Sequence, residues 1–368
     1  MKKDLSIYIH IPFCTSKCGY CSFYSVSDTS KMQQYIKAII RDLTTESVNL
    51  SDRNVITIYF GGGTPSLLNP DDIKKILNAV YENYTVSKTA EITLEANPDS
   101  LDEEKLLGYK NVGINRLSIG VQSFNDNELI LLSRRHTAKK AIDVINLAKS
   151  LNFKNISIDL IYNLPYSSLE SLKTSVLTAI SLNVNHISLY SLKLDENCAM
   201  AHQNLEMIDE DDELCQYLYI CEELGKNGFC HYEISNFAKK GYNSVHNTVY
   251  WKLGDYLGIG VSAHSYIDKK RYYYKNNISN YIKNPIKKPE AITTITKLEE
   301  FVMLALRLSY GLDFKVLKGY CDKAKFDSIL QKAKEIEKLQ LGNIIEDRFV
   351  LNENGMYLSN TIISALLF

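Results

Sequence analysis

The stretch IHIPFCTSKCGYCSF, residues 9–23, brings Cys14, Cys18 and Cys21 together in a chain that has only 8 cysteines among 368 residues. A structural zinc site usually needs four ligands drawn from two such groups, and no second group follows. His10 is the nearest further candidate, but along a strand its side chain would point away from the cysteine loop. A cubane iron–sulfur cluster held by three thiolates keeps one iron open to another ligand. The triplet therefore favours an open cluster over zinc.

Six runs typical of buried strands recur through the first half of the chain, and they end at glycine, proline or a polar residue. They cover residues 5–11, 55–63, 91–98, 116–123, 156–165 and 186–192. Helical patterns alternate with these runs. We therefore expect an α/β fold with a parallel sheet and outer helices, either an open doubly wound sheet or a partial barrel.

The helices between these strands show recognisable signals. An apolar stripe with spacings of three and four residues runs through 32–43. Asn69 is expected to cap the next helix, with Pro70 at its first position. Ser100 and Glu103 match a capping box for the helix after that.

Polar residues stand where the predicted strands end, which is where ligand chemistry gathers in parallel α/β sheets. Listed from the first strand to the fifth, they are Cys14, the GGGTPS motif at 61–66, Glu95 with Asn97, Gln122 and Asp159.

The alternation of strand and helix patterns ends after about residue 200. A long amphipathic helix is expected at 208–229, and the Pro-, Lys- and Thr-containing stretch 280–297 is typical of a linker. Helices follow, and then a hairpin that we expect to turn at Asn352–Gly355, as in a winged-helix-like α+β unit. We predict three domains, with boundaries at 1–200, 201–290 and 291–368.

The charge of the chain argues against binding to nucleic acid. The formal net charge is -1, and residues 313–368 hold 8 Lys or Arg against 8 Asp or Glu, so the winged-helix-like end lacks a basic footprint. No apolar run reaches the length of a membrane span, and the amino terminus does not match a signal peptide. We expect a cytoplasmic protein.

The remaining cysteines are scattered without ligand-like spacing, and we predict that they are small buried apolar residues. They are Cys198, Cys215, Cys221, Cys230 and Cys321.

The segment CTSKCGYC, with an aromatic residue before its last cysteine and a place directly after the first strand, resembles the radical S-adenosylmethionine (SAM) enzymes. The resemblance implies a partial (β/α)6 barrel and a [4Fe-4S] cluster on Cys14, Cys18 and Cys21. It also implies that the amine and carboxylate of SAM chelate the open iron. By the same resemblance, the residues that contact SAM or flank the cluster are Tyr8, Tyr20, Gly62, Gly63, Thr64, Glu95, Gln122, Arg134 and Asp159.

The chemical types of these residues suit SAM. GGGTPS lacks the lysine of a phosphate loop, and its backbone N–H groups and the Thr64 hydroxyl are expected to face the methionine end of SAM. Carboxylates and an amide suit an ammonium group and ribose hydroxyls, and Arg134 suits a carboxylate. The structural alternative for each is a buried polar side chain bonded to loop backbone.

A narrower resemblance extends along essentially the whole chain. The segments IYIHIPFC, GGGTPS, LSIGVQSFN, DLIYNLP and YLGIGVSAHS are similar to the coproporphyrinogen oxidase-like branch, which contains oxygen-independent coproporphyrinogen III oxidases and the heme chaperones called HemW. The oxidase pattern carries a further cysteine where this chain has Phe23, and a long amino-terminal extension before the cluster loop. Both differences favour the chaperones.

The HNTVYW segment at 246–251 matches a motif associated with heme binding in the HemW family. The resemblance implies a heme site made of His246, Asn247, Tyr250 and Trp251, with imidazole as the axial ligand and aromatic rings against the porphyrin. If the segment is helical, the first and third of these share a side. The alternative is a histidine and aromatic cluster in the core. His10 and His136 are expected to be structural hydrogen-bonding residues, whereas His264 could line the site.

The sequence thus predicts a heme chaperone that transfers heme to an acceptor protein. The alternative is an enzyme of porphyrin biosynthesis that decarboxylates coproporphyrinogen III to protoporphyrinogen IX. Besides heme and its acceptor, the implied partners are an electron donor such as a flavodoxin or ferredoxin and a second copy of the chain. Any contact with a membrane would come through the acceptor, and no residue is predicted to be catalytic.

Overall fold

Six parallel strands lie side by side in chain order in the computed structural model, which describes residues 2–290 and 296–368. The strands are β1 (Lys3–Ile11), β2 (Arg53–Gly62), β3 (Thr85–Ala96), β4 (Arg116–Gln122), β5 (Asn155–Tyr162) and β6 (His186–Ser191). A doubly wound sheet would reverse its strand order, and this sheet does not, so the partial barrel is confirmed and the barrel stays open.

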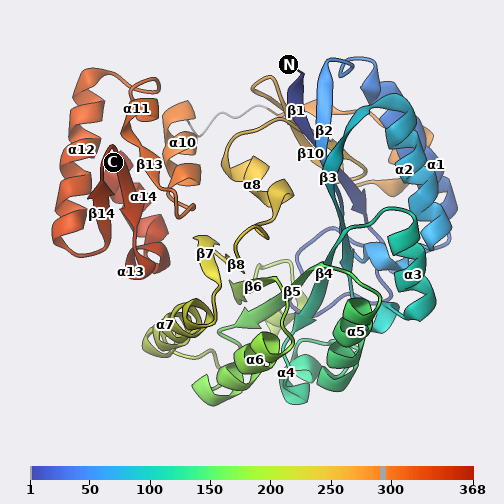
Figure 1. Cartoon of the computed structure of the whole chain (residues 1–368), viewed down its shortest axis with the longest axis horizontal. Helices are drawn as coiled ribbons and strands as arrows, with labels where there is room; N and C mark the ends of the chain where they lie inside the picture. The colour runs from blue at the N-terminus through green and yellow to red at the C-terminus, as the bar shows by residue number, and fades with distance from the viewer. Residues whose placement is uncertain (1, 291–295) are drawn as a thin grey trace.

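Helices cover the outer face of this curved sheet (Figure 1). They are α1 (Met32–Ser47), α2 (Pro70–Asn83), α3 (Glu103–Asn111), α4 (Asp126–Leu131), α5 (Ala138–Ser150) and α6 (Leu169–Ser181), with short 3-10 turns η1 (Pro65–Leu67), η2 (Pro98–Ser100) and η3 (Ala199–His202). The apolar stripe of α1 places Ile36 and Ile39 in the core together with Ile7 and Ile9 of β1. Burying each such side chain contributes about 1.5–3 kcal/mol.

The inner face of the same strands is polar. Successive strand residues point to opposite faces, and Ser6 and His10 of β1 alternate with apolar residues that belong to the core cluster. Glu95, Ser118 and Asp159 on neighbouring strands line one inner cavity. A barrel interior filled for stability alone would carry branched apolar side chains, so this interior is built to hold polar groups.

Residues 201–290 extend the sheet at both edges. At one edge, β7 (Cys230–Glu233) and β8 (Asn236–Ala238) follow β6, after the expected long helix α7 (Glu210–Lys226). At the other edge, the additions are β9 (Tyr256–Ile259), parallel to β1, then β10 (His264–Ile267), β11 (Lys270–Tyr273) and β12 (Lys288–Pro289). Two short helices belong to this part, α8 (Val245–Trp251) and α9 (Ile278–Lys283).

The carboxyl-terminal part is an α+β unit, drawn in orange and red in Figure 1. Its elements are α10 (Lys297–Ala305), β13 (Leu312–Asp313), α11 (Phe314–Leu317), α12 (Lys323–Lys338), β14 (Gly342–Ile345), β15 (Arg348–Leu351), α13 (Glu353–Tyr357) and α14 (Ser359–Leu367). The sheet order is β13-β15-β14. Of the predicted linker, residues 291–295 lie outside the described residues.

The predicted position of the hairpin turn is wrong. β14 and β15 pair from Gly342 with Leu351 to Ile345 with Arg348, so the chain turns at 346–347. Glu346 adopts a φ of 54°, which a tight hairpin turn requires. Asn352 instead caps α13, accepting a hydrogen bond from the Gly355 N–H at 2.9 Å.

Two helix starts also differ from expectation. Asn69 occupies the cap position of α2, but its side chain makes no capping hydrogen bond. Asp102, rather than Ser100, caps α3 by accepting from the Lys105 N–H. The Ser100 hydroxyl instead donates to the Asn97 carbonyl at 2.7 Å, because the chain makes a 3-10 turn before this helix.

The scattered cysteines are only partly as predicted. Cys198 and Cys221 are buried, whereas Cys215 and Cys230 are exposed and Cys321 lies between these extremes. None of the helices within 2–290 and 296–368 is long and apolar enough to cross a membrane.

Candidate functional site

The cysteine loop leaves the carboxyl end of β1, and hydrogen bonds join its two ends. Its base is fixed by two backbone hydrogen bonds, from the Cys14 N–H to the Val26 carbonyl at 3.0 Å and from the Val26 N–H to the Pro12 carbonyl at 2.7 Å. The Cys21 N–H donates to the Cys18 carbonyl at 3.2 Å, which turns the chain between the second and third thiols. All three cysteines are free thiols and partly buried.

The three thiols line one cavity of about 400 Å³ at the carboxyl ends of the barrel strands. Of the residues predicted for the cluster and SAM, only Tyr8 is absent from its lining. The structure therefore brings together Cys14, Cys18, Cys21, Tyr20, Gly62, Gly63, Thr64, Glu95, Gln122, Arg134 and Asp159. The lining also includes Ser118 and Tyr190, which sequence reasoning missed, and Asn97, which it placed at a strand end without a role. Asn97 stands at a strand end, and period-two alternation along the strands could have found the other two.

Glycines after β2 let the chain pass directly under the cysteine loop. A Cβ on Gly63 would stand 2.7 Å from the Phe13 carbonyl oxygen and 3.0 Å from Cys14 Sγ. Gly62 has a φ of 116°, and a Cβ there would stand 2.6 Å from the His10 ring. Only glycine fits both positions without displacing the cluster loop.

The expectation that backbone N–H groups of this motif face SAM is wrong, because protein oxygens already accept them. Gly63 and Thr64 donate to the carbonyls of Ile11 and Phe13, each at 2.8 Å, and Gly62 donates to Glu95 at 3.0 Å. The Thr64 hydroxyl lies 3.5 Å from Cys14 Sγ. The motif therefore fixes the cysteine loop, and its Thr64 hydroxyl donates toward the first of the three thiols.

Arg134 connects the cysteine loop to the strand ends. Its guanidinium donates to the Asn97 side-chain oxygen at 2.8 Å, to the Gly120 carbonyl at 2.6 Å and to Cys18 Sγ at 3.4 Å. Its Nε atom is buried and has no hydrogen-bond partner within the described parts of the chain. A cation so placed stabilises a thiolate and offers hydrogen bonds to a ligand carboxylate.

Two half-buried carboxyl groups, those of Glu95 and Asp159, line the same cavity as the thiols. Glu95 accepts hydrogen bonds from the Tyr59 hydroxyl at 2.7 Å and from the Gly62 N–H at 3.0 Å. Burial raises the pKa of Glu95 to about 7, and burial also raises the pKa of Asp159. A nearby cationic ligand stabilises the charged form of a carboxyl group whose pKa is raised. The side of the cavity with these two carboxyl groups therefore suits a cation such as an ammonium or a sulfonium.

The donor set fits the cofactors that the sequence implies. Within the described residues, no three His, Cys, Asp or Glu side chains stand close enough to hold one metal ion. The thiolates of a cubane bind different irons and so stand farther apart than the ligands of a single ion. With an arginine and two half-buried carboxyl groups beside them, the thiols suit a cluster whose open iron takes an amine and a carboxylate, with a sulfonium near the carboxyl groups.

The HNTVYW segment forms α8, which packs from the inner side against β2 (Figure 1). Ser244 caps the helix, and the buried carboxylate of Glu91 accepts hydrogen bonds from the N–H groups of Val245 and His246 at 3.2 and 3.0 Å. The helix start is thus anchored to β3 by a charge at its positive end.

His246 is buried inside the barrel, with a side chain that is fully engaged. Its Nδ1 lies 2.7 Å from the Thr57 hydroxyl, and its Nε2 lies 2.7 Å from the Tyr250 hydroxyl, which confirms that the latter shares its side of the helix. Burial lowers the pKa of His246 to about 3, so the ring is neutral. Tyr8, predicted to flank the cluster, lies deeper in the barrel, 6.3 Å from this ring between centroids.

The other residues of the motif make further contacts. Tyr250 packs edge-on against Tyr256, with ring centroids 4.6 Å apart, and Asn247 is half-buried. Trp251 lines a separate cavity of about 1190 Å³ next to the carboxyl-terminal unit. The motif therefore joins the barrel interior to that second cavity.

Three other histidines were considered for the site from the sequence, and none of them lines the cysteine cavity. His10 Nε2 lies 3.2 Å from the Tyr24 carbonyl oxygen and His136 Nε2 lies 3.1 Å from that of Val121, so both are structural as predicted. His264 is exposed, pairs with Glu290 at 3.3 Å and does not line the cysteine cavity.

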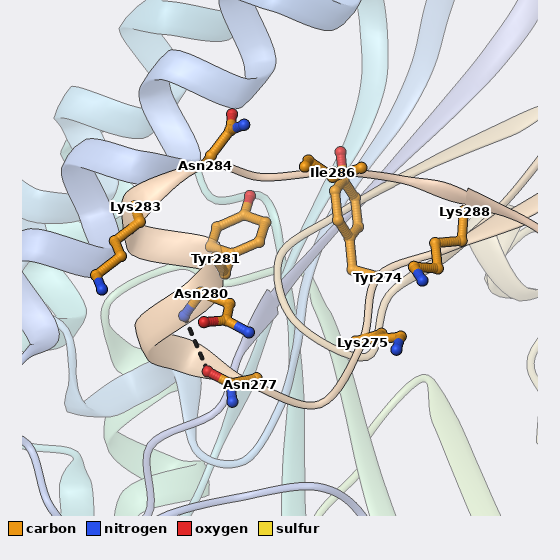
Figure 2. Close-up of a pocket in the computed structure, with 9 residues that line it drawn as sticks. All are labelled: Tyr274, Lys275, Asn277, Asn280, Tyr281, Lys283, Asn284, Ile286 and Lys288. Atoms are coloured by element: carbon orange, nitrogen blue, oxygen red, sulfur yellow. Dashed lines mark hydrogen bonds between the residues drawn. The ribbon is translucent and has the colours of Figure 1, made fainter.

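Figure 2 shows another pocket, of about 390 Å³, beside α9 and β12. Lys275, Lys283 and Lys288 line it together with Tyr274 and Tyr281. It contains none of the predicted site residues.

Two family models match the chain, that of the radical SAM superfamily over residues 8–179 and that of the HemN C-terminal domain over residues 292–358. Heme chaperone HemW of Buchnera aphidicola subsp. Acyrthosiphon pisum is 36% identical over 362 residues, covering 96% of this chain and 93% of its own. Heme chaperone HemW of Bacillus subtilis is 33% identical over 377 residues, covering 98% and 99%. Among solved structures, the coproporphyrinogen III oxidase HemN of Escherichia coli, a radical SAM enzyme, superimposes with a TM-score of 0.84 at 22% identity, covering 100% of this chain and 90% of that one. That likeness concerns the fold.

Proposed function

Because this chain belongs to the HemW heme chaperones of the radical SAM superfamily, we propose that it binds a [4Fe-4S] cluster, SAM and heme and transfers the heme to an acceptor protein. The observation that carries this proposal is the single cavity in which three free thiols meet Arg134 and two half-buried carboxyl groups. No other feature of the barrel requires three partly buried cysteines at that place.

Cys14, Cys18 and Cys21 would hold the cluster, and Arg134 would receive the SAM carboxylate. When bound, a reduced cluster of this kind supplies one electron to the sulfonium. The residues of the chain bind and orient: Glu95 and Asp159 offer their charge to the cationic part of SAM, and Gln122 offers an amide. The Gly63–Thr64 segment keeps the cysteine loop in register with these groups through its hydrogen bonds to β1 and the residues after it.

The heme part of the proposal comes from the HNTVYW helix and the names of the relatives. His246 is the ligand that the motif implies, and both of its ring nitrogens are hydrogen-bonded within the barrel. Iron coordination by this imidazole therefore requires the bond between Nε2 and the Tyr250 hydroxyl to open. Heme titration of His246→Ala decides whether the imidazole is needed.

The test of the whole proposal is anaerobic reconstitution of the full chain, with iron, sulfide, SAM and heme measured on one sample. We expect all four to bind, and Cys14→Ala, Cys18→Ala and Cys21→Ala each to lose iron and SAM together. Wild-type protein that takes up no heme would contradict the chaperone function. Iron retained in all three cysteine variants would contradict the cluster site.

The alternative is a coproporphyrinogen III oxidase, which the similarity in fold to HemN favours. Phe23, which lines the mouth of the cavity and is 69% exposed, stands where the oxidase pattern carries a cysteine. An assay of conversion to protoporphyrinogen IX with SAM and a reductant separates the two functions, because sustained turnover would replace the chaperone assignment. The acceptor protein, a flavodoxin or ferredoxin donor, the homodimer and the cytoplasmic location stay predictions.

A further inference from the structure

The cavity lined by Trp251 is a groove between two parts of the chain. One wall consists of the end of α8, the loop at 252–255 and strands β10 and β11, and the other consists of α10 and the segment around α11. Its volume is about 1190 Å³, against about 400 Å³ for the cysteine cavity. Figure 1 shows α8 between the barrel strands and the carboxyl-terminal helices. Ligand sites occur preferentially at such boundaries between structural units.

Both walls of the groove carry aromatic rings. Trp251, the only tryptophan of the chain, and Tyr266 line the barrel side. On the other side Phe301 and Tyr320 stack with ring centroids 4.3 Å apart and planes within 6° of parallel. Aromatic surfaces on both walls of a groove suit a flat apolar ligand such as a porphyrin.

The acidic residues of the groove are largely neutralised by partners. Asp255 and Asp268 accept hydrogen bonds from Arg53 at 2.5 and 2.7 Å. Glu300 pairs with Arg271, whereas Glu290 lies 3.3 Å from His264 and gains an opposite charge there only when that histidine is protonated. Among the described residues Asp4 is the exception, since it enters no ion pair.

Lys3 of the groove pairs with Asp268 at 3.1 Å, whereas four other lysines of the groove are exposed and enter no ion pair within 2–290 and 296–368. They are Lys252, Lys269, Lys270 and Lys297. The groove therefore presents unpaired positive charge beside its aromatic walls. Heme carries two carboxylates on an otherwise apolar disc, and this combination matches both features.

We propose that heme docks in this groove, with its disc against Trp251 and the Phe301–Tyr320 pair and its carboxylates at the lysines. The proposal rests on the proposed function and adds to it the location of the heme site. His246 then acts as a positioning residue. Residues five apart on a helix point about 140° away from each other, so His246 holds α8 in the barrel while Trp251 faces the groove.

The test is a heme titration of the reconstituted full chain, followed by the absorption of bound heme. The groove variant is Lys252→Glu, Lys269→Glu, Lys297→Glu, which changes exposed side chains only. The matched control is Lys275→Glu, Lys283→Glu, Lys288→Glu in the pocket of Figure 2, which reverses the same number of lysines elsewhere. We expect the heme Kd to rise roughly tenfold or more in the groove variant and to stay unchanged in the control.

A second variant, Tyr320→Ser, removes an exposed aromatic ring without altering charge, and we expect it to weaken heme binding while SAM binding stays unchanged. An unchanged heme Kd in both groove variants would overturn the proposal that heme docks in the groove. An equal loss in the groove and control triples would also overturn it, because the effect would then be general electrostatics. Failure of wild type to bind heme would instead overturn the proposed function itself.

Discussion

The ring of Tyr59 lies against the ring of His246, with centroids 4.8 Å apart and planes 24° from parallel. The hydroxyl of the same tyrosine donates a 2.7 Å hydrogen bond to Glu95 at the cysteine cavity. One residue of β2 therefore contacts both a carboxyl group of the proposed SAM site and the histidine of α8. The proposed SAM site is therefore linked through the interior of the barrel to the helix that carries Trp251 into the groove.

Tyr59→Phe should weaken SAM binding several-fold near neutral pH. Its hydroxyl stabilises the charged form of Glu95, and loss of this hydrogen bond raises the Glu95 pKa above about 7, so the carboxyl group is protonated in a larger fraction of molecules. Phenylalanine keeps the stacking on His246, so heme affinity measured alone should change little. A SAM Kd equal to that of wild type across pH 6–8 would contradict this link.

The pH dependence of stability provides a second test. The folded-state pKa of Glu95 is about 7, above its ordinary value of 4.5, so the folded protein retains a proton that the unfolded chain releases. The group therefore favours unfolding increasingly as pH rises from about 4.5 through 7, by an amount on the order of 3 kcal/mol in full. Relative to Glu95→Gln, the cofactor-free wild type should lose stability over this range in urea unfolding. A constant difference between the two proteins from pH 5 to 8 would contradict the buried carboxyl group.

Substitutions of His246 distinguish coordination from positioning. His246→Ala leaves the Thr57 and Tyr250 hydroxyls without partners inside the barrel, which costs about 1–3 kcal/mol for each buried group. The amide of glutamine in His246→Gln can form a hydrogen bond with one or both of these hydroxyls. If the histidine positions α8, glutamine restores heme affinity and leaves the absorption and electron paramagnetic resonance spectra of bound ferric heme unchanged. A spectrum altered equally in both variants identifies the imidazole as the iron ligand.

Gly63→Ala should reduce cluster loading. The added methyl group would stand 2.7 Å from the Phe13 carbonyl oxygen and 3.0 Å from Cys14 Sγ, so the cysteine loop has to move. Gly225→Ala in α7 is the control, because a Cβ there meets nothing within 4 Å and alanine favours a helix by about 0.5–1 kcal/mol. We expect iron and sulfide per chain to fall in Gly63→Ala only. Full cluster loading in Gly63→Ala as well as in Gly225→Ala would show that the cysteine loop tolerates the added methyl group.

The order and type of the barrel elements could be predicted because each strand is a compact apolar run that ends in a polar group. The same strand-end logic brought Glu95, Gln122 and Asp159 to one cavity with the thiols. Local capping was less predictable, because Ser100, Asp102 and Asn352 carry similar short polar side chains and only the path of the chain decides which of them caps a helix.

The environment of His246 was not readable from the HNTVYW motif. The motif gives the helix and the shared side of His246 and Tyr250, but Thr57 and Glu91 reach this helix from strands more than 150 residues earlier in the chain. The groove at Trp251 likewise depends on how the carboxyl-terminal unit packs, since Phe301 and Tyr320 have no sequence signal that ties them to the motif. Long-range packing of this kind determines which face of a motif is available to a ligand.

Every proposal above depends on three thiolates that hold an iron–sulfur cluster and leave one iron for SAM. Electron paramagnetic resonance of the anaerobically reconstituted, reduced full chain, recorded with and without SAM, tests this arrangement most directly. We expect about four irons per chain, a cluster signal that changes on addition of SAM, and loss of that signal in Cys18→Ala. A signal that does not respond to SAM, or one that survives the removal of Cys18, would contradict it.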